Sequence, residues 1–422
     1  MSAIDSEHSA PTTSPLVERP PRPRTGLRRF RVDVGGEYAV NGLIGLIFSC
    51  TGPVAVILAA GAAGSLTEAE LASWIFGVFF LNGILTVLAS WTYRQPLAFF
   101  WTIPGTVVVG SALGDLTWPE VIGAFIATGV LVLALGLTGW VRPVMDALPV
   151  PIVLAMVAGV FLHFGVELVQ ALGSDVGIAA PMVGAFLVLS ASPRMGRWIP
   201  AILGALIAGA VVTVASGRFD PEPATAGAIA HPVFTAPVWS WPAMIELVVP
   251  LAITVLVVQN GQGVAVLRAA GHQPPVNAAT IACGVWSLGA ACVGAVSTCL
   301  TGPTNALISA SGTRARQYTA GIVCGLLAIV FGILAPTFVR LMLAAPEAFV
   351  ATLGGLALLR ALQNSFTGAF GGKYTMGALI ALLITVADVK FLHIGAPFWG
   401  LVAGVAVSWT LERADWRSPR AA

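Results

Sequence analysis

Two short segments of this chain, residues 97–106 and 294–305, combine hydroxyl side chains with a paired proline and glycine inside otherwise apolar sequence. In each we expect the pair to open a short helix after a break, because proline is well tolerated in the first helical turn. The first N–H groups of a helix have no internal partner and suit an anion. Two such helices whose N-termini converge from opposite sides would bind an anion without a buried Lys or Arg.

The candidate substrate-binding residues in these segments offer hydroxyl, backbone and aromatic groups. They are Phe99, Thr102, Pro104, Gly105 and Thr106 in the first segment, and Ser297, Thr298 and Thr301 in the second. Two plainer interpretations stay open. The break can be a simple proline kink, and the hydroxyls can bond only the carbonyl four residues earlier.

An amide-rich stretch follows an unbroken apolar run over residues 247–258. Amides at membrane depth cost free energy unless they find partners. We predict that Gln259 and Asn260 contact the substrate, and bonding between helices is the alternative. Ser49 and Thr51 stand at the matching place in the first half and are candidates for the same reason.

Few ionisable groups within the apolar segments are placed to carry a coupling proton. The candidates are Glu246, His163, Glu167 and Asp388. His163 and Glu167 are four residues apart, so they share one face of a helix. An ordinary solvated charge is the alternative for Glu167.

The chemistry of an enzyme is missing from the sequence. It has no nucleophile triad, P-loop, metal cluster or dinucleotide fingerprint, so we expect no catalysis, no cofactor and no metal. The cysteines lie in apolar segments without metal-ligand spacing and are expected to serve as small apolar side chains. They are Cys50, Cys283, Cys292, Cys299 and Cys324.

The amino-acid composition indicates whether these groups belong to a soluble or a membrane protein. Of 422 residues, 57% are hydrophobic and 9% are charged, against about 25% charged in a typical soluble domain. A chain this poor in charge cannot cover a soluble surface, so we predict an all-α polytopic membrane protein. The net charge of +2 gives no indication of a nucleic-acid partner.

Apolar runs between loop residues predict fourteen spans, several of them short or broken. They cover residues 38–61, 70–92, 97–112, 118–139, 144–172, 178–192, 198–216, 242–270, 275–289, 291–311, 317–340, 346–366, 374–389 and 396–411. With a cytoplasmic N-terminus, only Arg218, Arg340 and Lys390 of the 21 Lys and Arg residues face outward. This asymmetry follows the positive-inside rule, so both termini should be cytoplasmic in a bacterial-type inner membrane.

The two halves of the chain are related by an internal repeat. Residues 54–61 return as residues 264–271 with six of eight positions identical. We therefore predict two seven-span repeats, 38–216 and 242–411, joined by an external loop at 217–241. The tails 1–36 and 412–422 would be cytoplasmic, the first one disordered. Because seven is odd, the second copy is inverted, as in many secondary transporters with a midplane substrate site. Chance similarity in apolar sequence is the alternative.

Over residues 38–412 the chain resembles the benzoate:proton symporter (BenE) family. The segments that carry the resemblance are Tyr93-Arg94-Gln95-Pro96, Thr102-Ile103-Pro104-Gly105, Gln259-Asn260, Arg268-Ala269-Ala270-Gly271, Pro274-Pro275-Val276-Asn277 and Ala396–Gly404. In pattern the family is similar to the larger group of uracil, nucleobase and sulfate transporters. One departure is that Val296 and Cys299 stand where the family usually has a His and an Asn.

The resemblance implies a core domain of 38–140 plus 242–340 and a gate domain of 141–216 plus 341–411. It also implies a homodimer that works by elevator-like movement of the core. Gln259 stands where the nucleobase branch has a glutamate, which favours a substrate with its own negative charge. The substrate ring would lie against Phe48, Phe99 or Phe100.

The leading hypothesis is therefore proton-coupled uptake of benzoate or a related aromatic or organic carboxylate. A nucleobase or inorganic-anion transporter of the same fold is one alternative. A passive anion channel, which would conduct without uphill accumulation, is the alternative from another class.

Overall fold

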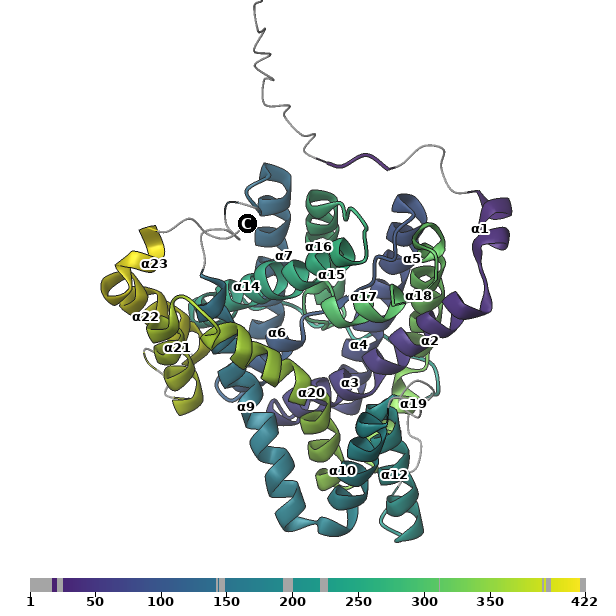
Figure 1. Cartoon of the computed structure of the whole chain (residues 1–422). Helices are drawn as coiled ribbons and strands as arrows, with labels where there is room; N and C mark the ends of the chain where they lie inside the picture. Colours follow the sequence, from purple (N-terminus) through teal and green to yellow (C-terminus); the bar gives the residue numbers. More distant parts are fainter. Residues whose placement is uncertain are drawn as a thin grey trace, which may run out of the picture.

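The computed structural model describes residues 17–20, 26–141, 143, 149–192, 200–220, 227–310, 312–388, 391 and 396–417, which are mostly helical (Figure 1). The first half contains α1 (Leu27–Asp33), α2 (Gly36–Cys50), α3 (Gly52–Ala63), α4 (Glu68–Phe76), η1 (Gly77–Leu81), α5 (Asn82–Tyr93), β1 (Phe99–Trp101), α6 (Ile103–Ala112), α7 (Trp118–Thr138), α9 (Val150–Ser174), α10 (Val176–Ala191) and α12 (Ala201–Ala215).

The second half contains a long helix with π-helical turns, a second short strand and a further series of helices. These are α13 (Trp241–Ala243), η2 (Met244–Val248), α14 (Val249–Ile253), η3 (Thr254–Asn260), α15 (Gly261–Ala269), α16 (Val276–Cys292), β2 (Thr298–Leu300), α17 (Gly302–Ile308), η4 (Arg314–Arg316), α18 (Tyr318–Ile333), α19 (Ala335–Leu343), α20 (Glu347–Phe370), α21 (Thr375–Ala387), α22 (Ala396–Leu411) and α23 (Arg413–Arg417).

Local chemistry sets several helix boundaries. α7 begins with a capping box between Thr117 and Glu120 and ends at Gly139, whose φ of 72° is the left-handed conformation that glycine adopts easily. Between α2 and α3, Thr51 has φ −95° and ψ −97°, outside the helical region. The predicted span 38–61 therefore consists of two helices that meet next to Gly52-Pro53.

Six helical stretches among the described residues are long and apolar enough to cross a bilayer. They are Gly36–Ala63, Glu68–Tyr93, Trp118–Thr138, Val150–Ser174, Trp241–Ala269 and Arg314–Ile333. α19 and α20 pass the same test together but are bent by 114°. The other apolar helices have 10–17 residues, fewer than the roughly 20 that one straight crossing needs.

The helices pack in two groups (Figure 1). In one, α5 contacts α18 and α7 contacts α16, so each pair joins the two halves of the chain. Glycine allows the close approach, because a Cβ on Gly83 would lie 2.7 Å from the carbonyl oxygen of Gly325. In the other group, α9 packs against α20, α21 and α22, and α10 and α12 pack together beside α20. α3 and α6 lie between the groups, since α3 contacts α20 and α6 contacts α9.

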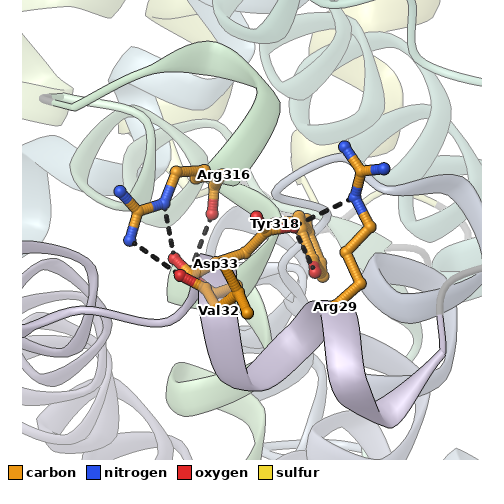
Figure 2. Close-up of polar contacts among 6 residues, drawn as sticks. Arg29, Val32, Asp33, Arg316 and Tyr318 are labelled. Carbon is orange, nitrogen blue, oxygen red and sulfur yellow. Dashed lines mark hydrogen bonds and ion pairs between the residues drawn. The ribbon is translucent and has the colours of Figure 1, made fainter.

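The N-terminal segment differs from the disordered tail predicted for residues 1–36 in two short stretches. Residues 27–33 form α1, and Figure 2 shows how its end docks. The Tyr318 hydroxyl donates to the Asp33 carboxylate (3.0 Å), Arg29 pairs with that carboxylate (3.5 Å), and Arg316 Nε donates to the Asp33 carbonyl (2.8 Å). Arg29 is a local partner, but Tyr318 and Arg316 come from the other half of the chain, so local composition gave no indication of them.

The second ordered stretch places Glu18 at the start of α16. Its carboxylate oxygens accept hydrogen bonds from the backbone N–H groups of Asn277 and Ala278, both at 3.0 Å. We expect Glu18→Ala to lower the free energy of unfolding by about 1 kcal/mol, because the helix loses a capping carboxylate. The exposed neighbour Arg19 is the control, and Arg19→Ala should change it by less than about 0.5 kcal/mol. Equal melting temperatures of the two variants in detergent would contradict the capping role.

Candidate functional site

The two segments that were predicted to be broken meet as a small antiparallel ribbon. β1 pairs with β2 in the register Phe99↔Leu300, Phe100↔Cys299 and Trp101↔Thr298. Two more backbone bonds extend the pairing, from Thr102 N to the Ser297 carbonyl and from Thr301 N to the Ala98 carbonyl, each 3.2 Å. The ribbon is buried. Its outer edges therefore need hydrogen-bond partners other than water.

Polar side chains from neighbouring helices supply partners to both edges. On β1, the Thr86 hydroxyl accepts from Phe99 N (2.9 Å) and donates to the Phe99 carbonyl (3.0 Å). On β2, the Ser287 hydroxyl accepts from Thr298 N (2.9 Å), and Asn260 Oδ1 accepts from Leu300 N (2.7 Å). Polar residues on α5, α16 and η3 thus bond the backbone at the edges of the buried ribbon.

Asn305 ties the ribbon to α17. Its Oδ1 accepts from Ala98 N (2.9 Å), and its Nδ2 donates to the Ala98 carbonyl (3.0 Å). Asn305, Thr86 and Ser287 were not among the predicted site residues. Their only signal was a lone polar residue in a helix, and that pattern does not tell which backbone group it meets.

The starts of the two short helices differ. α6 is capped internally, because the Thr102 hydroxyl accepts from Gly105 N (3.1 Å) and the Thr106 hydroxyl donates to the Thr102 carbonyl (3.0 Å). α17 begins after Thr301, whose side chain makes no capping bond to the helix. The Gly105 N–H that the sequence suggested for anion binding is therefore already bonded within the chain.

A small pocket opens where the strands end and these helices begin. It is called the ribbon pocket, and it is lined by Phe48, Ser49, Pro53, Phe100, Trp101, Ile103, Thr301, Pro303 and Thr304. The Ser49 and Thr304 hydroxyls lie 3.0 Å apart in it. Trp101 is 1% exposed, and its indole N–H has no hydrogen-bond partner among the described residues. A buried donor left unpaired is costly, so this N–H marks a place for an acceptor.

The predicted hydroxyl and aromatic residues divide between this pocket and the protein around it. Ser49 and Thr301 line the ribbon pocket, and so does Phe100. Phe99 packs instead in a separate apolar cluster with residues such as Val255 and Leu256. The other hydroxyls have different surroundings: Thr298 donates to Asn82 Oδ1 (2.8 Å), Thr51 donates to the Ile47 carbonyl (2.8 Å), and Ser297 Oγ has no partner among the described residues.

The two predicted amides also have different surroundings. Asn260 Oδ1 already accepts a hydrogen bond from Leu300 N in β2. Gln259 is 4% exposed, and its Oε1 has no partner among the described residues. Gln259 is not among the described residues that line the ribbon pocket. Its contact with substrate stays a prediction.

Three of the four candidate proton carriers line one cavity of about 420 Å³, called here the His163 cavity. It lies between α3 and α6 on one side and α9 and α21 on the other. His163 Nε2 is 3.0 Å from Glu167 Oε1, and Asp388 lines the same cavity. The fourth candidate, Glu246, is buried in η2 away from this cavity.

The chain matches the protein family described as "Benzoate membrane transport protein" over residues 36–410. It is 28% identical over 392 residues to the benzoate membrane transport protein of Acinetobacter baylyi, which covers 92% of this chain and 98% of that protein. It is 27% identical over 371 residues to the inner membrane protein YdcO of Escherichia coli, covering 86% and 93%.

Solved transporter structures share the fold at low sequence identity. The transmembrane domain of a cyanobacterial bicarbonate transporter, BicA, is 14% identical with a TM-score of 0.57, covering 88% of this chain and 98% of that one. Murine Solute Carrier 26 family member A9, an anion transporter in the inward-facing state, is 13% identical with a TM-score of 0.62, covering 90% and 68%. These likenesses establish the architecture of the helices and not the substrate.

Proposed function

The chain belongs to the family of benzoate membrane transport proteins, and on that premise we propose that it takes up benzoate or a related aromatic carboxylate together with a proton. Its family and relatives are transport proteins, so it is a membrane transporter and not an enzyme. The proposal places the substrate in the ribbon pocket. The observation that carries it is the unpaired, buried indole N–H of Trp101, a residue that lines that pocket.

The residues that line the ribbon pocket suit an aromatic carboxylate for two reasons, and the pocket's volume of about 10 Å³ means that it must widen to admit a ring. Phe48, Phe100 and Ile103 give its wall an apolar surface for a ring. The Trp101 N–H is a neutral donor for a carboxylate, whereas the Ser49 hydroxyl already donates to the Gly45 carbonyl (2.9 Å) and accepts from Thr304 (3.0 Å). The described lining residues include no Lys or Arg. A bound anion would therefore bring net charge into the membrane, and an accompanying proton would remove that cost.

The proposed route for the proton is the His163 cavity. His163 and Glu167 are already within hydrogen-bonding distance. α6 connects this cavity to the ribbon pocket, because Ile103 lines the pocket while Val107 and Ser111 line the cavity. A change of protonation at the cavity would thus act on the same helix that contacts the substrate.

We further propose the alternating-access architecture implied by the repeat. It consists of two inverted seven-span repeats, a core domain moving past a gate domain, a homodimer, and cytoplasmic termini in an inner membrane. The helix pairs that join the two halves support this proposal. α3 supports it as well, because Pro53 at its start lines the ribbon pocket and Ala63 at its end lines the His163 cavity.

The direct test is uptake of radiolabelled benzoate into proteoliposomes with and without an inward proton gradient. Protein-free liposomes serve as the control, because uncharged benzoic acid crosses lipid by itself. We expect a protein-dependent initial rate that rises with the gradient. Protein-dependent flux that does not change with the proton gradient, together with electrical conductance, would indicate a channel. No protein-dependent benzoate flux would reject the substrate, and competition by nucleobases and inorganic anions would then decide between the alternatives.

A further inference from the structure

A second cavity lies next to the ribbon pocket and contains a positive charge. This Arg360 cavity, of about 340 Å³, is lined by Phe48, Pro53, Phe186, Leu189, Ser190, Ser192, Pro200, Ala201, Ile202, Leu356, Ala357 and Arg360. Its volume falls in the range of about 300–1,000 Å³ that is usual for small-molecule sites. Phe48 and Pro53 line both this cavity and the ribbon pocket, so the two are neighbours.

We propose that the Arg360 cavity is a second binding site for an aromatic carboxylate, on the cytoplasmic side of the ribbon pocket, with the Arg360 guanidinium as its anion-binding group. The proposal rests on the proposed function, because it takes the same class of substrate. It adds a second binding site, the residue that binds the carboxylate there, and a further step in the path of the substrate.

The chemistry of the walls matches this ligand. Phe186, Leu189 and Leu356 offer apolar surface for a ring. Arg360 is the charged residue among the described residues of the lining, and it forms no ion pair with any described residue. A guanidinium binds a carboxylate through paired N–H donors, which fixes orientation as well as charge. An inorganic anion would use the guanidinium and leave the apolar wall without a function.

The position of the cavity indicates which side of the membrane it faces. Its lining comes from the end of α10, the start of α12 and the middle of α20, which lie together in Figure 1. The connection between α10 and α12 is one that the distribution of basic residues predicts to face the cytoplasm. Phe48 is partly exposed and stands between the two sites. A carboxylate leaving the ribbon pocket would pass Phe48 and meet Arg360 before reaching water.

Occupancy of this cavity can be measured without transport. Ser190 is exposed at its rim, and Ser190→Cys places a thiol there with little change in size. The background carries Cys292→Ala, which removes an exposed natural thiol. In inside-out membrane vesicles, an impermeant maleimide should label Cys at position 190. Benzoate at ten times its dissociation constant should slow labelling about tenfold.

Arg360→Gln in the same background should raise the benzoate concentration that gives half-maximal protection about five- to tenfold. The reason is that a charge-assisted bond is lost at a site that salt partly screens. Arg360→Lys should restore part of it. The matched control is Arg413→Gln, another exposed arginine that does not line the cavity, which should leave protection unchanged.

Three results would overturn the proposal. They are labelling that benzoate does not slow, protection that persists in Arg360→Gln, and labelling only in right-side-out vesicles. The second would mean that benzoate acts through the ribbon pocket by changing the conformation. Failure of the proposed function appears separately, as a wild-type protein without protein-dependent benzoate flux. In that case, protection of the Ser190→Cys protein by benzoate that is lost in Arg360→Gln would still locate a carboxylate site at Arg360.

Discussion

Trp101→Phe is expected to raise the KM for benzoate about 10- to 100-fold while the protein stays folded. The substitution keeps an aromatic ring but removes the indole N–H together with two ring carbons. Trp101 lines the ribbon pocket, and this N–H has no partner among the described residues. A hydrogen bond to a charged group contributes about 1.5–3 kcal/mol, and each 1.4 kcal/mol is about tenfold in affinity. Initial rates of protein-dependent uptake over a range of benzoate concentrations measure the change.

Trp74 provides a matched control for this prediction. It is fully buried, and its indole N–H also has no partner among the described residues. It packs against Trp118 and Phe125 and does not line the ribbon pocket. Trp74→Phe should therefore leave KM within about twofold. If the two variants have the same KM, the Trp101 N–H does not bind the carboxylate.

Glu167→Gln is expected to uncouple benzoate flux from the proton gradient. If one proton accompanies each carboxylate, one pH unit supplies about 1.4 kcal/mol. That free energy can shift the ratio of inward to outward protein-dependent flux by up to about tenfold. In Glu167→Gln this ratio should approach one, because the amide cannot carry the proton. Exchange of labelled for unlabelled benzoate needs no net proton movement and should persist.

The contrast between coupling and exchange separates a proton role from simple damage. His163→Gln should show a weaker form of the same defect, since its Nε2 is 3.0 Å from Glu167 Oε1. Glu37→Gln is the control, because Glu37 is exposed at the start of α2 and lines neither cavity nor pocket. A Glu167→Gln protein with an unchanged flux ratio would rule out Glu167 as the carrier, and Glu246 would be the next residue to test.

The sequence indicated the family of the chain more reliably than the contacts of single side chains. The family of the chain followed from short motifs, and the match over residues 36–410 confirms it. Phe99 and Phe100 show the difficulty at finer scale, because these neighbours in sequence have different surroundings in the fold. Phe100 lines the ribbon pocket and Phe99 packs in another cluster. Without the register of the ribbon, the sequence could not tell them apart.

The buried polar residues also show that the sequence does not decide which atoms are available to a substrate, but for a different reason. Gln259 and Asn260 are neighbours in sequence and were predicted to do the same thing. Asn260 bonds the backbone of Leu300, whereas Gln259 Oε1 has no partner among the described residues. Whether a buried polar atom is available to a substrate depends on what the fold has already bonded to it.

The sequence by itself determined that this is a helical membrane protein and which family it belongs to. These properties depend on composition and on neighbours within a few residues. The tertiary structure alone decided that the two breaks pair as a ribbon and that Asn305 reaches Ala98 across 207 positions of sequence. It also decided that Asp388 shares a cavity with His163 and Glu167. Such contacts join residues far apart in the chain, and no local pattern encodes them.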